Sequence, residues 1–377
     1  MRAAVQRHGA LALSAVLLLG LLTGCTGHSG EKSWSELTPQ STTELKYAKQ
    51  FKIEDCGDGL SRITIAQDRQ YLLVQEGAQI PAGVPEEVTV LQQPIQNIYL
   101  TATASMDLFR ALDGLDVIRL SGTKESGWYL PEAQQAMEAG DILYAGKYNA
   151  PDYELILAQK CGLAVESTMI YHNPEVKEQL ESLGIPVLVD YSSYESDPLG
   201  RMEWIKLYGA LLGKEEEAAR IFDEEVAAVQ PVLNQTNTGK TVAFFYITNT
   251  GTVNVRKSSD YIAQLIRMAG GVYVPENQSD GEENALSTMN IDMESFYAAA
   301  HDADVLIYNS TVDGELASLD ELLKKSELLA DFKAVQNGNV WCTGKNMFQS
   351  LGRMIQEINA VLTQQAPDGL TYLYRLS

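Results

Sequence analysis

Histidine is scarce in this sequence, with only four among 377 residues. His8 and His28 stand ahead of any globular pattern, so His172 and His301 alone remain for the folded body. A zinc or manganese site usually needs several imidazoles, and two are too few for a three-histidine site. Direct capture of such a metal ion by the protein's own histidines is therefore excluded.

Cysteine is equally scarce. Four are present, and their spacing fits no zinc motif: Cys25, Cys56, Cys161 and Cys342. Cys25 is assigned to a lipid anchor below, which leaves an odd number that permits at most one disulfide. Cys161 and Cys342 adjoin apolar runs, so we expect both to be buried as small hydrophobic side chains.

The apolar run over residues 11–22 is too short to span a bilayer, which takes about 20 residues. Arg2 and Arg7 precede it, and Leu22-Thr23-Gly24-Cys25 follows it. A charged start, a short apolar core and a small-residue end are typical of a secretory signal. The last four residues resemble the lipobox of bacterial lipoproteins, in which the cysteine receives a diacylglyceryl group and becomes the mature N-terminus.

By this resemblance, residues 1–24 are a lipoprotein signal peptide and Cys25 carries the lipid. Residues 25–43 are polar and without periodicity, and we expect a flexible tether there. The protein would then be extracytoplasmic and lipid-anchored to the cell membrane, with no other membrane contact. The plainer alternative is an ordinary signal peptide that happens to end near a cysteine.

Basic residues are few: 28 Lys and Arg face 50 Asp and Glu, for a formal net charge of −22. Such a surface repels phosphates, so a nucleic-acid partner is excluded. It suits a soluble body that stays clear of anionic lipid headgroups while its tail is tethered. A hydrophobic content of 45% and a charged content of 21% are ordinary for a globular protein.

Strand and helix patterns alternate through most of the chain, which predicts an α/β fold. In the clearest unit a strand over residues 163–166 is followed by a helix over residues 174–183 and a strand over residues 185–189. Asn173 precedes Pro174 as an N-cap, and Gly184 ends the helix. A βαβ unit of this kind predicts a parallel sheet with helices on both faces.

No strand pattern interrupts residues 198–236, where a helix over residues 214–234 would be about 30 Å long. We therefore predict two Rossmann-like lobes joined by a long backbone helix. The expected ranges are an N-terminal lobe over residues 44–197, a helical linker over residues 198–236 and a C-terminal lobe over residues 237–377. Two short β-like runs, residues 61–66 and 70–75, predict an edge hairpin in the first lobe.

Several segments of the chain, in their order and spacing, resemble one family. They are residues 150–158 leading into 163–167, residues 173–189, residues 194–204, residues 293–297 with 303–308, and residues 337–343. Together they are similar to the helical-backbone class (class III) of substrate-binding proteins of ABC importers, which serve iron–siderophore, haem and vitamin B12 uptake. Asp197 departs from the pattern, because a histidine would be expected there.

The resemblance implies an extracytoplasmic binding component that captures a metal chelate and delivers it to an ABC permease dimer with its ATPase. An iron–siderophore is the first choice of ligand, with a corrinoid or haem as alternatives, and no cofactor and no second subunit are expected. The sequence holds no nucleophile elbow, phosphate loop or paired metal motif, so we expect no enzyme. A sensory or adhesive lipoprotein that reuses the fold is the alternative of another class.

The ligand is expected between the lobes, on loops that are rich in aromatic side chains and carry a few cations. Aromatic faces hold flat chelates, and cations neutralise anionic ones, although core packing is the commoner role of any single aromatic. The candidates are Trp128, Tyr129, Lys147, Tyr148, Tyr171, His172, Arg201, Tyr246, Arg256, Lys257 and Trp341.

The resemblance also implies one surface glutamate on each lobe that docks into the permease. The matching positions are Glu154 and Glu294, each early in an expected helix. Two charges held on rigid helices would fix the register of docking. The simpler explanation is that acids suit the first turn of any helix, because they complement its dipole.

Overall fold

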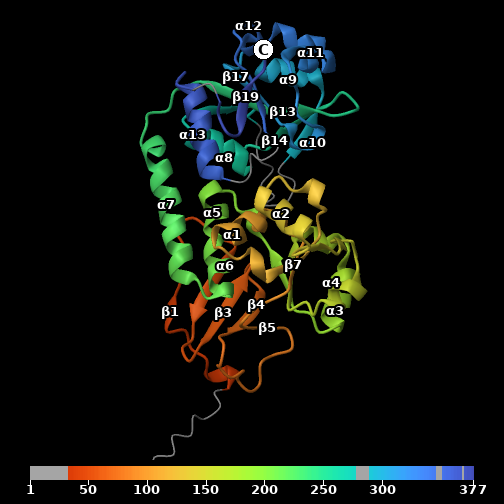
Figure 1. Cartoon of the computed structure of the whole chain (residues 1–377). Helices are drawn as coiled ribbons and strands as arrows, with labels where there is room; N and C mark the ends of the chain where they lie inside the picture. The colour runs from red at the N-terminus through yellow and green to blue at the C-terminus, as the bar shows by residue number, and fades with distance from the viewer. Residues whose placement is uncertain (1–32, 277–287, 345–349, 367–368) are drawn as a thin grey trace, which may run out of the picture.

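The computed structural model describes residues 33–276, 288–344, 350–366 and 369–377. Figure 1 shows an N-terminal β-sheet at one end, an α/β lobe beside it and a second α/β lobe at the other end. Cys25 and residues 26–32 of the expected tether lie outside the described residues. Residues 33–43 are not the flexible segment expected there, because they include a 3-10 turn (Trp34–Glu36) and a strand (Ser41–Thr42), and Leu37 is buried. Among those described, no helix is both long and apolar enough to cross a membrane.

The N-terminal sheet has five strands in the order β1-β2-β3-β4-β5, antiparallel except for the parallel pair β4–β5. Its strands are β1 (Ser41–Thr42), β2 (Phe51–Asp55), β3 (Leu60–Ile65), β4 (Arg69–Val74) and β5 (Thr89–Gln92). The expected hairpin exists as β3–β4, but it lies in the middle of this sheet and not at an edge.

The first lobe is built on a parallel sheet in the order β12-β11-β6-β7-β8. Its strands are β6 (Ile98–Leu100), β7 (Ile118–Ser121), β8 (Leu143–Tyr144), β11 (Leu163–Ser167) and β12 (Val187–Asp190), and a small hairpin adds β9 (Gly146–Lys147) and β10 (Ala150–Pro151). Its helices are α1 (Met106–Ala111), α2 (Pro131–Ala139), α3 (Tyr153–Ala158) and α4 (Pro174–Ser182). The predicted βαβ unit is therefore confirmed as β11-α4-β12.

Three helices follow without a strand: α5 (Pro198–Glu203), α6 (Ile205–Leu212) and α7 (Glu215–Leu233). The long helix α7 packs against α6 on the first-lobe side and against α13 (Leu351–Leu362) of the second lobe. Figure 1 shows it running along one side of the molecule between the two lobes. The predicted backbone helix is therefore confirmed.

The second lobe has a mixed sheet in the order β16-β14-β13-β17-β18-β19, with β15 paired to β13. Its strands are β13 (Thr241–Ile247), β14 (Val253–Arg256), β15 (Val272–Val274), β16 (Thr288–Ile291), β17 (Val305–Tyr308), β18 (Val340–Thr343) and β19 (Leu373–Arg375). Besides α13 its helices are α8 (Tyr261–Met268), α9 (Met293–Ala300), α10 (Ser310–Asp313), α11 (Leu319–Lys325) and α12 (Lys333–Gln336).

Short 3-10 turns join these elements: η1 (Trp34–Glu36), η2 (Thr103–Ser105), η3 (Leu115–Val117), η4 (Glu125–Gly127), η5 (Thr168–His172), η6 (Ser192–Tyr194) and η7 (Glu327–Asp331). Two of them, η5 and η6, follow directly after the neighbouring strands β11 and β12. They therefore lie at the carboxyl edge of the first-lobe sheet, where ligands of parallel α/β folds usually bind.

The N-terminal sheet shares one hydrophobic core with the first lobe and the helical linker. Phe51 and Ile63 from the sheet belong to the same buried cluster as Leu188 of β12 and Trp204 of the linker. The hydroxyl of Tyr71 in β4 accepts a hydrogen bond from the backbone N–H of Val189, at 3.4 Å. The sheet thus covers the outer edge of β12, which would otherwise be an open strand edge.

Two buried carboxylates fasten the segment 46–50 to the helical linker. Glu203 accepts hydrogen bonds from the backbone N–H groups of Lys46, Tyr47 and Ala48, at 2.7–3.0 Å. Glu195 accepts those of the next two residues, Lys49 and Gln50, at 2.9–3.0 Å. Five successive backbone donors are thus satisfied by two side chains, and we name this arrangement the carboxylate clamp.

The two acids of the clamp differ in their ionisation. Burial pushes the pKa of Glu203 upward, but the Lys206 ammonium at 2.7 Å and the backbone donors outweigh it and hold the pKa below its usual value. At Glu195 burial prevails and raises the pKa, although its backbone donors and the indole N–H of Trp204 oppose the rise. Glu203 therefore keeps its negative charge to a lower pH than Glu195 does.

Replacing the first anchor, Glu203→Gln, should lower the free energy of unfolding by about 3 kcal/mol, because an amide cannot accept four donors and leaves buried N–H groups unsatisfied. Urea unfolding followed by circular dichroism measures the change. Glu224→Gln, on the exposed face of α7 and paired with Arg220, is the control and should change little. Equal losses in the two variants would contradict the role of the clamp.

Candidate functional site

The gap between the lobes contains a pocket of about 420 Å³, which we name the aromatic pocket. The first lobe, the linker and the second lobe all contribute to its wall. It is lined by Thr103, Ala104, Met106, Asp107, Leu108, Gly127, Trp128, Tyr129, Leu130, Ser192, Arg201, Met202, Tyr261, Thr311 and Leu351. A ligand here would touch both lobes at once, as expected for a binding site between two domains.

Two of the predicted aromatic residues belong to this pocket. The Trp128 indole N–H donates to the Ser121 hydroxyl at 3.2 Å, so the ring is fixed by the carboxyl end of β7. Trp128 is only 5% exposed, whereas its neighbour Tyr129 is 49% exposed. Trp128 therefore forms a rigid part of the wall, and Tyr129 stands at the mouth.

Arg201 is the predicted cation that the structure places in the pocket wall. Its Nε donates to the backbone carbonyl of Glu195 at 3.0 Å, and its guanidinium lies 3.5 Å above the ring of Tyr261 in the second lobe. Burial lowers the pKa of Arg201, but an arginine stays charged at neutral pH. Its Nη2 donates to the backbone carbonyl of Ser193 at 2.5 Å, and no carboxylate of the described chain forms an ion pair with it, so the pocket is lined by a cation without an acidic partner.

Asp197, which departs from the family pattern, holds this arginine indirectly. Its side chain accepts a hydrogen bond from the backbone N–H of Leu199 at 2.8 Å and so caps the start of α5. Arg201 lies one turn further along the same helix. The aspartate therefore has a local structural role: it caps the helix that carries Arg201 and so fixes the position of the arginine backbone at the pocket.

Four other predicted residues of the first lobe lie outside the pocket wall. Tyr171 packs against Tyr191, and the Arg69 guanidinium of β4 lies 4.9 Å from both ring centres. His172 is exposed beside it, on η5. Lys147 and Tyr148 belong to the β9–β10 hairpin, where Lys147 is exposed and Tyr148 half-buried.

The predicted residues of the second lobe also lie outside the wall. Tyr246 is half-buried within β13, and Arg256 and Lys257 sit at and just beyond the end of β14. The Arg256 guanidinium is 3.9 Å from Asp260, the N-cap of α8. None of these three side chains lines the aromatic pocket.

Trp341 lies in the core of the second lobe. It is 5% exposed, and its indole N–H donates to Asn339 at 3.1 Å, toward the amino end of β18. The Arg375 guanidinium covers its ring at 5.0 Å. The second lobe contributes Tyr261, Thr311 and Leu351 to the wall of the interlobe pocket, and Trp341 is not among the lining residues.

The sequence analysis missed most of the apolar wall and one aromatic residue. Met106, Leu108, Met202 and Leu351 form hydrophobic surface that looks like ordinary core in the sequence. Tyr261 was also missed, although it directly follows the N-cap Asp260 and closes over Arg201. The signal that could have found it is its place at the first turn of a helix after a strand.

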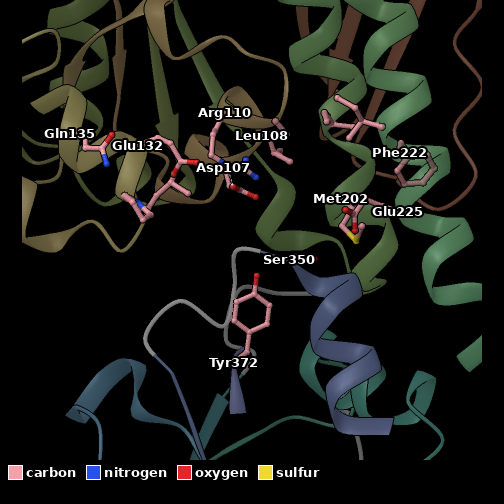
Figure 2. Close-up of a pocket in the computed structure, with 15 residues that line it drawn as sticks. Asp107, Leu108, Arg110, Glu132, Gln135, Met202, Phe222, Glu225, Ser350 and Tyr372 are labelled. Carbon is pink, nitrogen blue, oxygen red and sulfur yellow. Dashed lines mark hydrogen bonds and ion pairs between the residues drawn. The ribbon is translucent and has the colours of Figure 1, made fainter. Parts of the chain in front are cut away.

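A second pocket of about 510 Å³ adjoins the first on the side of α7, and we name it the acidic pocket. Figure 2 shows Asp107 and Arg110 of α1, Glu225 of α7 and Tyr372 of the second lobe around it. Asp107 and Arg110 form an ion pair at 2.7 Å. The two pockets share Asp107, Leu108, Leu130 and Met202, so the gap has two chemically different halves.

Metal ligands are not clustered in the described ranges of the chain. There, no group of three or more histidine, cysteine, aspartate or glutamate side chains is placed to hold a metal ion. The three cysteines within these ranges, Cys56, Cys161 and Cys342, are unpaired thiols, and burial raises the pKa of each.

A buried acid, Glu166, stands at the carboxyl end of β11 beneath the loops of the first lobe. The Thr101 hydroxyl donates to one of its oxygens, and the other oxygen is buried without a hydrogen-bond partner in the described part of the chain. Burial raises the pKa of Glu166 to about 7, and only the Thr101 hydrogen bond opposes the rise. Below pH 7 the folded protein therefore prefers this acid in its protonated form.

Stability should fall as the pH rises toward 7, because unfolding releases Glu166 to ionise near its usual pKa of 4.5. Glu166→Gln cannot ionise, so its free energy of unfolding should exceed the wild-type value by up to about 3 kcal/mol at pH 8 and match it near pH 4. Urea unfolding across this pH range measures the difference, with exposed Glu178→Gln as the control. A difference independent of pH would contradict the assignment.

The fold and the gap define a class of protein: two α/β lobes joined by a backbone helix, with a binding pocket between them. The family model described as "Periplasmic binding protein" matches residues 100–347, and the chain belongs to this family. The predicted resemblance is thereby confirmed. The match begins after β5, so the N-terminal sheet lies outside the matched range.

Known relatives and structures agree with this membership. An uncharacterised lipoprotein of Methanocaldococcus jannaschii is 26% identical over 325 residues, which cover 81% of this chain and 75% of the relative. The periplasmic haem-binding protein HutB of Vibrio cholerae has a TM-score of 0.58 at 18% identity, covering 72% of this chain and 99% of HutB. The vitamin B12-binding protein BtuF of Vibrio cholerae has a TM-score of 0.52 at 15% identity, covering 72% and 98%. At these identities the two structures show a shared fold.

Proposed function

We propose that the chain is the extracytoplasmic substrate-binding component of an ABC importer, which captures a metal chelate between its lobes and delivers it to the permease dimer. The aromatic pocket carries this proposal, because both lobes and the linker build it and an unneutralised arginine lines it. Membership in the periplasmic binding protein family supports it. The haem-binding and B12-binding names of proteins with the same fold point in the same direction.

The ligand we propose is an anionic chelate with flat or apolar surface. Trp128, Tyr129 and Tyr261 offer aromatic faces, and Arg201 offers the charge. A volume of about 420 Å³ falls within the range of about 300–1,000 Å³ typical of small-molecule pockets. An iron–siderophore is our first choice, and a corrinoid or haem are the alternatives by the same mechanism.

The proposed setting is the outer face of the cell membrane. Cys25 would carry the lipid, and the tether would let a monomeric body reach its permease. The lipoprotein name of the archaeal relative supports an anchor of this kind. The role is binding and handover without chemical change to the ligand; a sensory or adhesive lipoprotein would keep the pocket but need no permease.

Glu154 and Glu294 are the proposed docking residues. Each is exposed in the first turn of a short helix, α3 in the first lobe and α9 in the second. Aspartates cap both helices: Asp152 accepts from the Leu155 N–H at 3.0 Å and Asp292 from the Ser295 N–H at 2.7 Å. Rigidly held acids on both lobes suit a symmetric pair of arginine pockets.

A panel of ferric siderophores, haem and cobalamin, screened by thermal shift, should contain a ligand that raises the melting temperature by mass action. Arg201→Gln should then weaken that ligand about 10- to 100-fold, because one charge-assisted contact is lost. Exposed Arg220→Gln is the control. Tyr129→Ala is a second variant, which removes an aromatic face at the mouth of the pocket and leaves the contacts of Arg201 in place. Binding of no chelate, or equal affinity in Arg201→Gln, would contradict the proposal.

Docking is tested separately from binding. The double variant Glu154→Ala/Glu294→Ala should reduce uptake of the bound ligand at least about 10-fold while its affinity for the purified protein stays the same. A matched control, Glu178→Ala/Glu327→Ala, removes one exposed acid from each lobe away from the two docking helices. Full uptake by the first double variant would exclude these residues as the contact.

A further inference from the structure

Three parts of the fold bring polar groups into the acidic pocket. Asp107 comes from α1 of the first lobe, Glu225 from the backbone helix α7, and Tyr372 from the segment before β19 of the second lobe. Figure 2 shows Tyr372 with its hydroxyl directed into the gap that faces Asp107 and Met202. A molecule in this pocket would therefore contact both lobes and the helix that joins them.

The Tyr372 hydroxyl has no hydrogen-bond partner among the residues that the structure describes. Tyr372 is only 6% exposed, and its backbone N–H donates to Glu357 at 2.8 Å, so its position is fixed. The phenol group, in contrast, makes no hydrogen bond to any described residue. Because Tyr372 lines the acidic pocket, its hydroxyl is available for a hydrogen bond to a molecule bound there.

Glu225 is also without a hydrogen bond or ion pair within the described chain. It is half-buried, and its Oε2 lies over Gly352 of α13, where an added Cβ would come within 3.1 Å of it. The absence of a side chain at Gly352 thus makes room for the carboxylate between α7 and α13. Two polar groups from different elements, Glu225 and the Tyr372 hydroxyl, therefore line one cavity, and neither is paired with any other described residue.

The charge of the pocket is negative. Asp107, Glu132 and Glu225 line it, and Arg110 is the single cation among the lining residues, already engaged by Asp107. Burial raises the pKa of Asp107 and of Glu225, and the Arg110 contact only partly offsets the rise at Asp107. Burial and the nearby acids likewise raise the pKa of Tyr372. A positive ligand would stabilise the charged forms that burial disfavours.

Apart from Gln135 and Ser350, the remaining wall is apolar. Leu108, Ala111, Ile205, Ile221 and Phe222 provide hydrocarbon and aromatic surface between the charged groups. Because the acids are not clustered as a metal site, a small inorganic ion would not reach them together. A ligand with a positive head and an aliphatic body matches both the charge and the walls.

We propose that the acidic pocket is a second binding site, which takes a small organic cation: a protonated aliphatic amine. Its ammonium group binds Glu225 and the Tyr372 oxygen, and its hydrocarbon body lies against Ile221 and Phe222. Because the amine contacts both lobes and α7, and because Asp107 and Met202 belong to both pockets, its binding is coupled to that in the aromatic pocket. By linkage, each ligand changes the affinity of the other by the same factor.

Calorimetric titration of the full chain with 1,4-diaminobutane tests the site, with uncharged 1,4-butanediol at equal ionic strength as the matched ligand. We expect a saturable one-to-one isotherm for the diamine and none for the diol. Glu225→Gln should weaken the diamine at least about 10-fold and Tyr372→Phe several-fold, because a charged and a neutral hydrogen bond are lost. Glu224→Gln, the adjacent exposed acid of α7, should bind as the wild type does.

Unsaturable heats, equal binding of the diol, or equal loss in Glu224→Gln and Glu225→Gln would overturn the proposal. Circular dichroism of each variant separates loss of binding from loss of fold, and Tyr372→Phe keeps the ring and so the packing. The titration contains no chelate, so failure of the amine site leaves the transport proposal untouched. Conversely, a chain that binds no chelate can still show this isotherm.

Discussion

The carboxylate clamp is the interaction on which the arrangement of the first half of the molecule depends. The segment 46–50 runs between the N-terminal sheet and the linker without a strand or helix of its own, so its backbone donors would be buried unpaired. Glu203 and Glu195 satisfy them from α5 and from the residues just before it. Glu195 also offers its backbone carbonyl to Arg201. The same short stretch therefore joins the N-terminal sheet to the linker and holds the cation of the aromatic pocket in place.

The gap between the lobes is organised by charge as well as by shape. On one side Arg201 rests on Tyr261 with no ion pair to a carboxylate of the described chain. On the other side lie Glu132, Glu225 and Arg110, and Asp107, which pairs with Arg110, lines both pockets. An anion and a cation would thus be sorted to different halves of one gap. The net charge of the protein is −22, so an anionic ligand is repelled by the protein as a whole. The aromatic rings that line the pocket lower the local dielectric constant, and this strengthens the attraction between Arg201 and an anion bound there.

Much of the fold could be predicted from local signals, and the site only in part. Pro174 and Gly184 bound a helix through backbone geometry alone, which is why β11-α4-β12 was found. In β18 every residue is buried, so the sequence does not show which face meets the gap, and Trp341 was placed there by its residue type. Tyr171 packs against the Arg69 guanidinium and does not line the aromatic pocket. The two residues are about 100 positions apart in the sequence, so no local pattern predicts this contact. The predicted first lobe, residues 44–197, includes most of the N-terminal sheet, which the structure shows as a sheet of its own, and the limits of the lobes remain a prediction.

The backbone helix limits how the gap can change. Helix α7 packs on α6 at one end and on α13 at the other, and Gly352 lets α13 approach Glu225 closely. A helix held on both lobes resists the wide hinge motion that a flexible strand connection allows. The aromatic pocket must therefore be largely formed before the ligand arrives, and selectivity has to come from side chains fixed by their own hydrogen bonds. Trp128, through its hydrogen bond to Ser121, and Arg201, through its hydrogen bond to Glu195, meet that requirement.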